Sequence, residues 1–237
     1  MAKTTAVHLK GKVEGLIFYE RAGRSYVRTA PSRVRQSRAT KASARRFGMA
    51  ASMSAALRKG LATTFPELQQ WKHTHPLNTA LLNWLREKES GSRPTSSTSL
   101  DRFSFNKSHS LYSRLSKAVR VEWSKTGVLE IRVPALTPIE DIDAPARTRA
   151  VYWKIAAASC TVRNPSQIGY LAGTNFEMPY QNKPIVARQI EFAFPLKPGE
   201  LAVVAIGLEY QVENKGRISK MADPRWLPLN IVGYVST

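Results

Sequence analysis

The chain has 237 residues and a formal net charge of +19, and this charge is unevenly distributed. Residues 1–60 contain fourteen lysines and arginines but only two acidic residues, Glu14 and Glu20. Such a block predicts a polyanionic partner: nucleic acid, an anionic membrane surface or an acidic protein. A single cysteine, Cys160, excludes a disulfide framework and a cysteine-based zinc site, and we expect it to be a buried small hydrophobe.

The N-terminus lacks the apolar segment of a signal peptide, and the sequence has no run of about eighteen apolar residues that could span a membrane. We therefore expect a cytoplasmic protein, or a component of a particle assembled in the cytoplasm.

Residues 11–30 predict a β-hairpin. Val13 and residues 16–19 form an apolar strand, and residues 25–28 form the returning strand. Between them, Gly23 can adopt the positive φ of a tight turn. Pro31 ends the pairing because proline has no N–H to donate. The spacing of Gly11 and Gly15 in a strand context predicts a bulge or close backbone packing.

A helix is predicted from Ser37 or Thr40, either of which could be the N-cap, to Gly60. Its apolar stripe has the spacing 3, 4, 3, 4 and consists of Phe47, Ala50, Ser54, Leu57 and Leu61. A second helical unit is predicted over residues 66–88, broken at His75 and Pro76. Its apolar face contains Leu77, Leu81, Trp84 and Leu85. We expect the two helices to form an antiparallel pair packed on the hairpin.

The second half of the chain predicts strands. Residues 90–99 are rich in Ser, Thr, Gly and Pro and indicate a linker or an exposed loop. From residue 111 onward, short apolar runs alternate with Pro-, Gly- and Asn-rich turns, which is typical of an antiparallel β-sandwich. We therefore predict an α+β protein with a hairpin and helical module at 1–89, a linker or exposed loop at 90–110 and a sandwich at 111–237.

The opening of the chain also resembles a known family. The residues that carry the resemblance are Gly11, Gly15, Gly23, Arg24, Val27, Arg28, Pro31, Thr40, Phe47 and the segment 57–61. They are similar to those of a family of uncharacterised Bacteroidota proteins, in which a glycine-punctuated hairpin ends in an Arg-Pro-type exit and leads into a helix. A β-rich C-terminal region follows at similar length. The resemblance implies this fold outline and no activity.

The basic residues after the first strand are the main candidates for a binding site. Arginine suits phosphate because its planar fork binds two oxygens at once. The predicted polyanion-binding arm consists of Arg24, Arg28, Arg33, Arg35, Arg38, Lys41, Arg45 and Arg46. Tyr19, Tyr26 and Phe47 could stack on bases, or could equally be core residues of the hairpin and helix. The alternative for the whole segment is a charged surface that only keeps the protein in solution.

Glu140, Asp141 and Asp143 form the one acidic cluster. They match only fragments of a calcium-binding loop, so a solvated loop is the simpler interpretation. They could also form a docking patch for the basic arm of a neighbouring copy. No catalytic motif or phosphate-binding glycine loop occurs, and we expect no enzymatic activity, cofactor or metal.

These patterns lead to two functional hypotheses. The first is a non-enzymatic structural or assembly protein that self-associates and engages nucleic acid or an acidic neighbour through its basic arm. The second is a dedicated, sequence-independent DNA- or RNA-binding protein whose sandwich recruits a partner. A small-ligand or glycan site at the sandwich, lined by aromatic residues, stays open. The aromatic candidates are Trp153, Tyr170, Tyr180 and Trp226.

Overall fold

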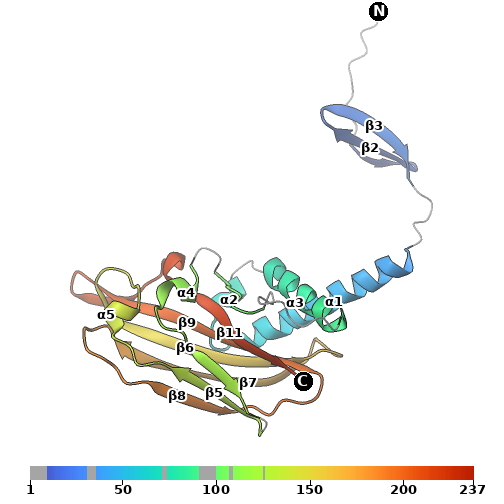
Figure 1. Cartoon of the computed structure of the whole chain (residues 1–237). Coiled ribbons are helices and arrows are strands. Elements are labelled where there is room, and N and C mark those ends of the chain that lie inside the picture. The colour runs from blue at the N-terminus through green and yellow to red at the C-terminus, as the bar shows by residue number, and fades with distance from the viewer. Residues whose placement is uncertain (1–9, 31–35, 71–73, 91–99, 107–108, 125) are drawn as a thin grey trace, which may run out of the picture. The chain divides into compact units, whose positions relative to one another are not determined.

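The computed structural model of the chain describes residues 10–30, 36–70, 74–90, 100–106, 109–124 and 126–237 (Figure 1). The chain divides into two compact units, Met1–Ser43 and Ala44–Thr237. The first contains a small antiparallel sheet, and the second contains helices and an antiparallel β-sandwich. The predicted α+β fold class is confirmed.

The first unit holds a three-stranded sheet in the order β1 (Gly11–Val13), β2 (Leu16–Arg21) and β3 (Arg24–Thr29). Each connection has two residues with positive φ: 43° and 83° in the first turn, 50° and 72° in the second. This conformation suits the right-handed twist of the strands, and glycine adopts it most easily. The predicted hairpin is confirmed, but Gly15 lies in a turn. The predicted bulge or close packing there is wrong, since a Cβ on Gly15 would meet no atom within 4 Å.

Helix α1 (Arg38–Leu61) begins in the first unit and ends in the second. The Ser37 side chain accepts a hydrogen bond from the Thr40 backbone N–H at 3.1 Å, which confirms the predicted N-cap. The predicted stripe is buried from Ala50 to Leu61. Phe47 is the exception, because its side chain is 52% exposed.

The second helical unit consists of α2 (Glu67–Gln70) and α3 (Thr74–Ser90). The predicted break at His75 and Pro76 is misplaced, since α3 already begins at Thr74. Pro76 therefore lies in the first turn, where the missing N–H of proline costs no helical hydrogen bond. The predicted apolar face of this helix is buried.

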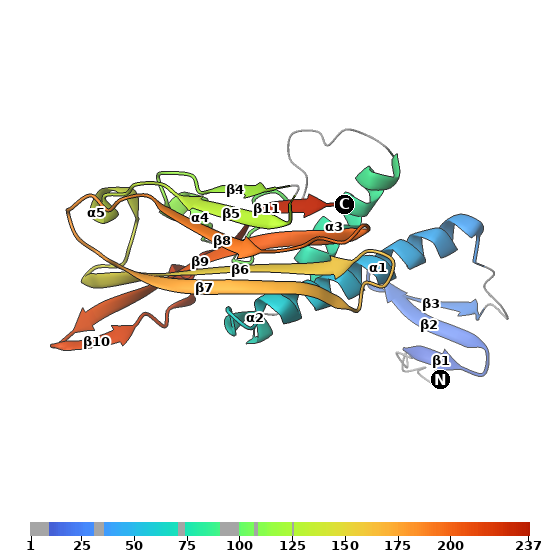
Figure 2. The ribbon, with the colours of Figure 1, turned by 90° about the horizontal axis from the view of Figure 1, so that it is seen from below.

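The sandwich consists of two antiparallel sheets. In the larger sheet, β6 lies between β7 and β9, and the other edge of β9 pairs with both β10 and β11 (Figure 2). Its strands are β6 (Thr148–Thr161), β7 (Ile168–Pro179), β9 (Glu200–Asn214), β10 (Arg217–Lys220) and β11 (Leu229–Ser236). The smaller sheet has the order β4 (Arg120–Trp123), β5 (Val128–Val133) and β8 (Arg188–Ala193). Short helical segments outside the sheets are α4 (Leu111–Arg114), α5 (Pro138–Asp141) and η1 (Pro224–Trp226).

Strands β6 and β9 of the larger sheet are buried on both faces, whereas β7 and β10 are largely exposed. Small residues of β6 and β9, such as Ala158 and Ala205, lie in a core with α1 and α3. The alternate residues, such as Trp153 and Ile206, lie in a second core with the smaller sheet. Since successive side chains of a strand point to opposite faces, one sheet serves both cores.

This arrangement differs from the predicted domain boundaries. The helices share a core with the sandwich, and the compact units divide after Ser43 and not at residues 90–110. Within the predicted linker, Leu100 and Phe105 are fully buried. The backbone N–H of Phe105 donates to the Leu229 carbonyl at 2.9 Å, which ties this segment to β11.

Candidate nucleic-acid interface

The register of the N-terminal sheet sorts its side chains onto two different faces. Paired residues of neighbouring strands share a face, and so do alternate residues of one strand. In β2 and β3, Tyr19 pairs with Tyr26 and Arg21 with Arg24, while Ile17 pairs with Arg28 and with Lys12 of β1. One face therefore carries Lys12, Ile17, Tyr19, Arg21, Arg24, Tyr26 and Arg28. We name this the cationic face.

The two tyrosines form an exposed aromatic surface at the centre of the cationic face. Their rings are stacked with centroids 5.5 Å apart and planes inclined by 19°. Tyr19 is 38% exposed and Tyr26 is 41% exposed. The guanidinium carbon of Arg28 lies 5.9 Å from the Tyr19 ring centroid, within the range of a cation–π contact.

The four basic side chains of this face are not neutralised by the protein. Within the described residues, none of Lys12, Arg21, Arg24 and Arg28 forms an ion pair with a carboxylate. Glu20 pairs with Ser25 in the ladder and therefore lies on the opposite face of the sheet. The cationic face consequently has a single sign of charge.

The opposite face of the sheet is apolar at its centre and largely exposed, with Glu20, Ser25 and Thr29 towards its ends. It carries Val13, Leu16, Phe18 and Val27, of which Val13 is 54% and Val27 is 55% exposed. A sheet of three short strands without a covered apolar face has little core of its own. This face, which we name the apolar face, is therefore a surface suited to a partner.

The structure separates the residues of the predicted basic arm. Arg24 and Arg28 lie on the cationic face, Arg38 and Lys41 lie in the part of α1 that belongs to the first unit, and Arg45 and Arg46 belong to the second. Arg33 and Arg35 lie outside the described residues. Arg46 forms an ion pair with Glu89 at 3.1 Å, and Phe47 is exposed on α1.

Lys12 and Arg21 are functional candidates that the sequence interpretation missed. The sequence does contain a signal for them. Side chains on one face of a strand recur at every second residue, and counting in this way from the two-residue turns places Lys12 and Arg21 on the same face as Tyr19 and Arg28.

The acidic cluster is used within its own chain. Hydrogen bonds from Lys117, Ser116 and the Thr137 backbone lower the pKa of Asp141 to about 2. The Lys117 Nζ to Asp141 Oδ2 distance is 2.7 Å. Asp143 forms an ion pair with Arg114. These internal partners argue against the predicted docking patch. Among the described residues, Glu140 is the one member of the cluster that is exposed and forms no ion pair.

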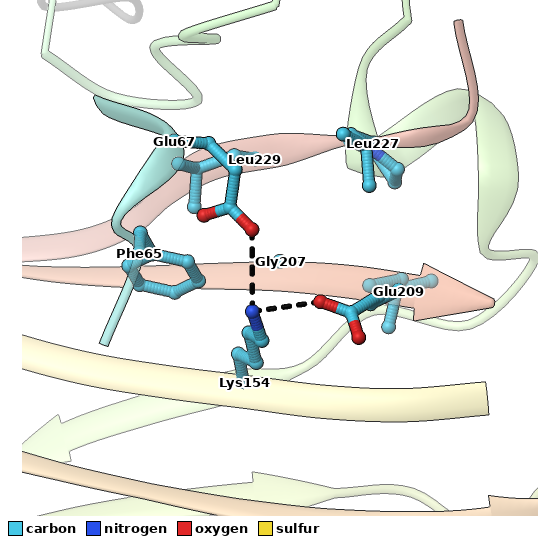
Figure 3. Close-up of a pocket in the computed structure, with 9 residues that line it drawn as sticks. Phe65, Glu67, Lys154, Gly207, Glu209, Leu227 and Leu229 are labelled. Carbon is cyan, nitrogen blue, oxygen red and sulfur yellow. Dashed lines mark hydrogen bonds and ion pairs between the residues drawn. The ribbon is translucent and has the colours of Figure 1, made fainter. Parts of the chain in front are cut away.

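A small hollow between α2, β6 and β9 contains a partly buried ion cluster (Figure 3). Lys154 Nζ lies 2.8 Å from Glu209 Oε2 and 3.3 Å from Glu67 Oε1. Burial lowers the pKa of Lys154, but its hydrogen bond to Glu209 and the two carboxylate charges outweigh this and raise it. The lysine is therefore a cation and not a nucleophile. The hollow of about 20 Å³ has room for about one water molecule.

Other chemistries find little support in the described part of the chain. No group of three or more His, Cys, Asp or Glu residues there could hold a metal ion. No helix in the same residues is long and apolar enough to cross a membrane. Cys160 is buried as predicted, and burial together with the charge of Glu200 raises the pKa of its thiol to about 12.

The aromatic residues of the sandwich do not converge on one site. Trp153 is fully buried. Tyr170 packs against Phe194, Tyr180 donates a hydrogen bond to the Ile142 carbonyl at 3.1 Å, and Trp226 packs against Tyr210.

Comparisons with known proteins do not show a family for this chain. No protein-family model matches the sequence, and no curated protein matches it. Among solved structures, the chain is similar to one described as "CC2D1B coordinates ESRCT-III activity during the mitotic reformation of the nuclear envelope". The identity is 10%, the match covers 85% of this chain and 76% of that chain, and the TM-score is 0.23. A likeness at this TM-score supports no inference about fold or function.

Proposed function

We propose that this chain is a non-enzymatic assembly protein that binds single-stranded nucleic acid through the cationic face of its N-terminal sheet. The observation that carries the proposal is the collection of Lys12, Arg21, Arg24 and Arg28 around two exposed, stacked tyrosines. Guanidinium groups bind phosphate oxygens without regard to sequence, and aromatic rings accept any base by stacking.

The order of the rows across this face suits a nucleotide chain. A basic row, Arg21 with Arg24, is followed by the tyrosine row and then by a row that holds Arg28 and Lys12. Alternate residues of a strand are about 7 Å apart, so each basic row lies about 7 Å from the tyrosines. A base stacked on a tyrosine can therefore have its flanking phosphates at the two basic rows. The bases of a duplex are stacked on each other and are not free for this contact.

The apolar face supports the assembly part of the proposal. Its exposed valines and leucine would be covered if two copies associated through this face, which would leave both cationic faces free for nucleic acid. Association through the cationic faces themselves is opposed by like-charge repulsion. Pairing through this face alone gives a dimer, so the proposal adds a further contact between β-sandwiches, which makes the β-sandwich the building block of a larger particle.

The second candidate is a dedicated nucleic-acid-binding protein that does not assemble. The same cationic face favours it, and the state of the protein without nucleic acid distinguishes the two. We would measure light scattering and absorbance at 260 and 280 nm on the purified full chain, in low and high salt.

The assembly proposal predicts particles larger than a dimer that persist in high salt after bound nucleic acid has been removed. A monomer or dimer released by high salt together with nucleic acid would favour the dedicated binding protein. A monomer free of nucleic acid at both salt concentrations would contradict both candidates.

A further inference from the structure

Strand β7 forms one edge of the larger sheet (Figure 2). It is 12 residues long, about twice the usual length of a strand. Its one charged residue is Glu177, and its one proline, Pro179, is its last residue. Proteins protect the edges of their sheets with charged residues, prolines or short strands, because an unprotected edge pairs with other chains. Most of β7 lacks this protection.

The other strands at the edges of the two sandwich sheets are short, charged or covered. Strands β4 and β10 have four residues each, and two residues of each strand are charged. Strand β8 has six residues, of which Arg188 and Glu191 are charged. The outer edge of β11 is covered by residues 103–105, which form backbone hydrogen bonds with Leu229 and Ile231. Among the described strands of the sandwich, β7 is therefore the exception.

The register with β6 shows which backbone groups of β7 point outward. In an antiparallel ladder, hydrogen-bonded pairs alternate with pairs whose N–H and C=O groups point away from each other. The Tyr180 N–H donates to the Arg149 carbonyl at 2.9 Å, so this pair, just beyond the end of β7, is hydrogen-bonded. Counting back along β7, every second pair with β6 is hydrogen-bonded too. The residues between these pairs, whose backbone groups point away from β6, are Leu171, Gly173, Asn175 and Glu177.

The outward groups of these four residues have no partner in the part of the chain that the structure describes. No hydrogen bond from another backbone or side-chain group there ends on their N–H or C=O groups. All four residues are exposed, whereas residues 172, 174 and 176 between them are half-buried. Strand β7 thus presents a row of backbone donors and acceptors on which another strand can be added.

We propose that β7 pairs with β7 of a second copy, antiparallel and about a two-fold axis at Thr174. In this register Leu171 lies opposite Glu177 of the second copy, and Gly173 lies opposite Asn175 of the second copy. Each hydrogen-bonded pair exchanges two bonds, and the two-fold axis repeats both pairs, so about eight backbone hydrogen bonds form. The larger sheets of the two copies then join into one continuous sheet.

The sequence of β7 favours a second copy as the partner. In this register the two copies of Glu177 lie about 20 Å apart, so the one charge of the strand does not oppose self-pairing. A shift of the register towards one end would bring Pro179, which has no N–H, into the ladder. A shift towards the other end would use Gly169, which lies in a bulge of β7 where the register with β6 changes. The register about Thr174 avoids both.

This inference rests on the proposed assembly function and supplies the contact between β-sandwiches that it requires. The apolar face joins copies in pairs, and β7 is a second self-pairing surface that lies in the other compact unit. A chain with two different self-pairing surfaces links more than two copies. The two proposals can fail separately, because pairing through β7 needs neither the N-terminal sheet nor nucleic acid.

The first test traps the pair with a disulfide, in high salt and without nucleic acid. Opposed Cα atoms in a hydrogen-bonded antiparallel pair are about 5.5 Å apart, which a disulfide can span. The full chain with Leu171→Cys/Glu177→Cys should therefore form a covalent dimer on mild oxidation, seen on a non-reducing gel. Leu171→Cys alone and Glu177→Cys alone are the matched controls. Each should form no covalent dimer, because its cysteine lies about 20 Å from the same cysteine of the second copy.

Asn175→Pro tests the pairing without a cross-link. Proline removes the outward N–H but no hydrogen bond to β6, so the strand is retained, whereas pairing of β7 should weaken about tenfold or more. Asn175→Thr keeps the N–H and should associate as the parent protein does. Both are made in a Val13→Lys/Val27→Lys parent, in which charge blocks the apolar face and leaves β7 as the pairing surface. Analytical ultracentrifugation gives the dimer dissociation constant, and circular dichroism checks the fold.

The inference is overturned if the double-cysteine variant forms no covalent dimer, or if either single-cysteine control cross-links equally well. Equal association of Asn175→Pro and Asn175→Thr would also overturn it. If Asn175→Pro in the otherwise unchanged chain still forms particles larger than a dimer, the assembly proposal stands and pairing through β7 is wrong. If the cross-linked dimer forms but the full chain binds no nucleic acid, this inference stands and the proposed nucleic-acid binding is wrong.

Discussion

At the scale of single residues, Tyr19 and Tyr26 are the side chains through which the proposed binding of bases can be told apart from attraction to charge alone. Their stacked rings are exposed on the cationic face, and their contact with each other leaves area uncovered. Stacking on an aromatic ring is tolerant of sequence but requires an unpaired base.

We therefore expect Tyr26→Ala to weaken binding of a single-stranded oligonucleotide about tenfold, within the range of a lost base–aromatic contact. Tyr26→Phe retains the ring and should bind as the wild type does. Fluorescence anisotropy with a labelled single strand and the corresponding duplex is the measurement. Equal losses of affinity for both forms, or a loss in the Phe variant, would show that the ring does not stack on bases.

Asp141 is a residue with a structural role, and its pKa gives a dependence on pH. Its folded pKa of about 2 lies below the value of about 3.9 for an unfolded aspartate. A depressed folded pKa contributes stability above the unfolded pKa, and this contribution is lost as the pH falls towards the folded pKa. Asp141→Asn should therefore unfold at a lower urea concentration than the wild type at pH 7.

The difference between the two proteins should shrink as the pH falls from about 4 to 2, because the wild-type carboxylate becomes protonated there. Glu140→Gln, a change at the exposed neighbouring residue, is the control and should have little effect at either pH. A difference for Asp141→Asn that is as large at pH 2 as at pH 7 would contradict this role for the carboxylate.

Sequence patterns identified only part of the candidate site. The basic residues were counted correctly, but a count cannot tell which of them share a surface. Which side chains share a surface depends on the register of the strands. The Glu14–Gly15 turn sets this register for β1, but the sequence pattern predicted a bulge or close packing at Gly15. Asp141 shows the same limit, since its partners Ser116 and Lys117 are distant in sequence.

At the scale of elements, the contact of α1 with the larger sheet depends on a glycine. A Cβ on Gly60 would lie 2.6 Å from Leu171 Cδ2 and 3.0 Å from Ala158 Cβ. Gly48, on the same helix, is exposed and has no atom within 4 Å of such a Cβ. The two positions therefore separate helix propensity from packing.

Gly48→Ala should raise the free energy of unfolding by up to about 1 kcal/mol, the difference in helix propensity between the two residues. Gly60→Ala should lower it by about 1–3 kcal/mol, the usual cost of overpacking a core. Urea denaturation of the full chain gives both values. If Gly60→Ala stabilises as much as Gly48→Ala does, the close contact with the sheet is not a constraint.

Elements with one buried face were easier to predict than those with two. The stripe on α1 and the alternation in β4 and β5 both follow from a single buried face. In β6 and β9 both faces are buried, so their apolar residues run continuously and do not alternate. The apolar run at 201–212 predicts most of the 15-residue β9, whereas the run at 151–155 predicts less than half of the 14-residue β6. Strand β7 was missed because its exposed side chains and two glycines gave no apolar alternation.

At the scale of the whole molecule, the basic residues and the β-sandwich are concentrated in different parts of the chain. The sequence divides the charge this way, with an excess of twelve basic residues in 1–60 and of two in 126–237. The division between compact units could not be predicted, because the helices that follow the basic region supply one of the sandwich's two cores. The family resemblance of the opening segment stays a prediction.

The central claim is that the cationic face contacts phosphates. The most direct test is the affinity of the full chain for a single-stranded oligonucleotide, measured by fluorescence anisotropy over a range of salt concentrations. The wild type is compared with Arg21→Gln/Arg24→Gln and with the control Arg163→Gln/Arg217→Gln, which removes two exposed arginines of the second unit.

If Arg21 and Arg24 each contact a phosphate, the dependence of log affinity on log salt should become less steep by about 1.4 in their double variant, since each contact with a single strand contributes about 0.7. The control should keep the wild-type slope. An unchanged slope for Arg21→Gln/Arg24→Gln, or an equal reduction in the control, would contradict binding through this face.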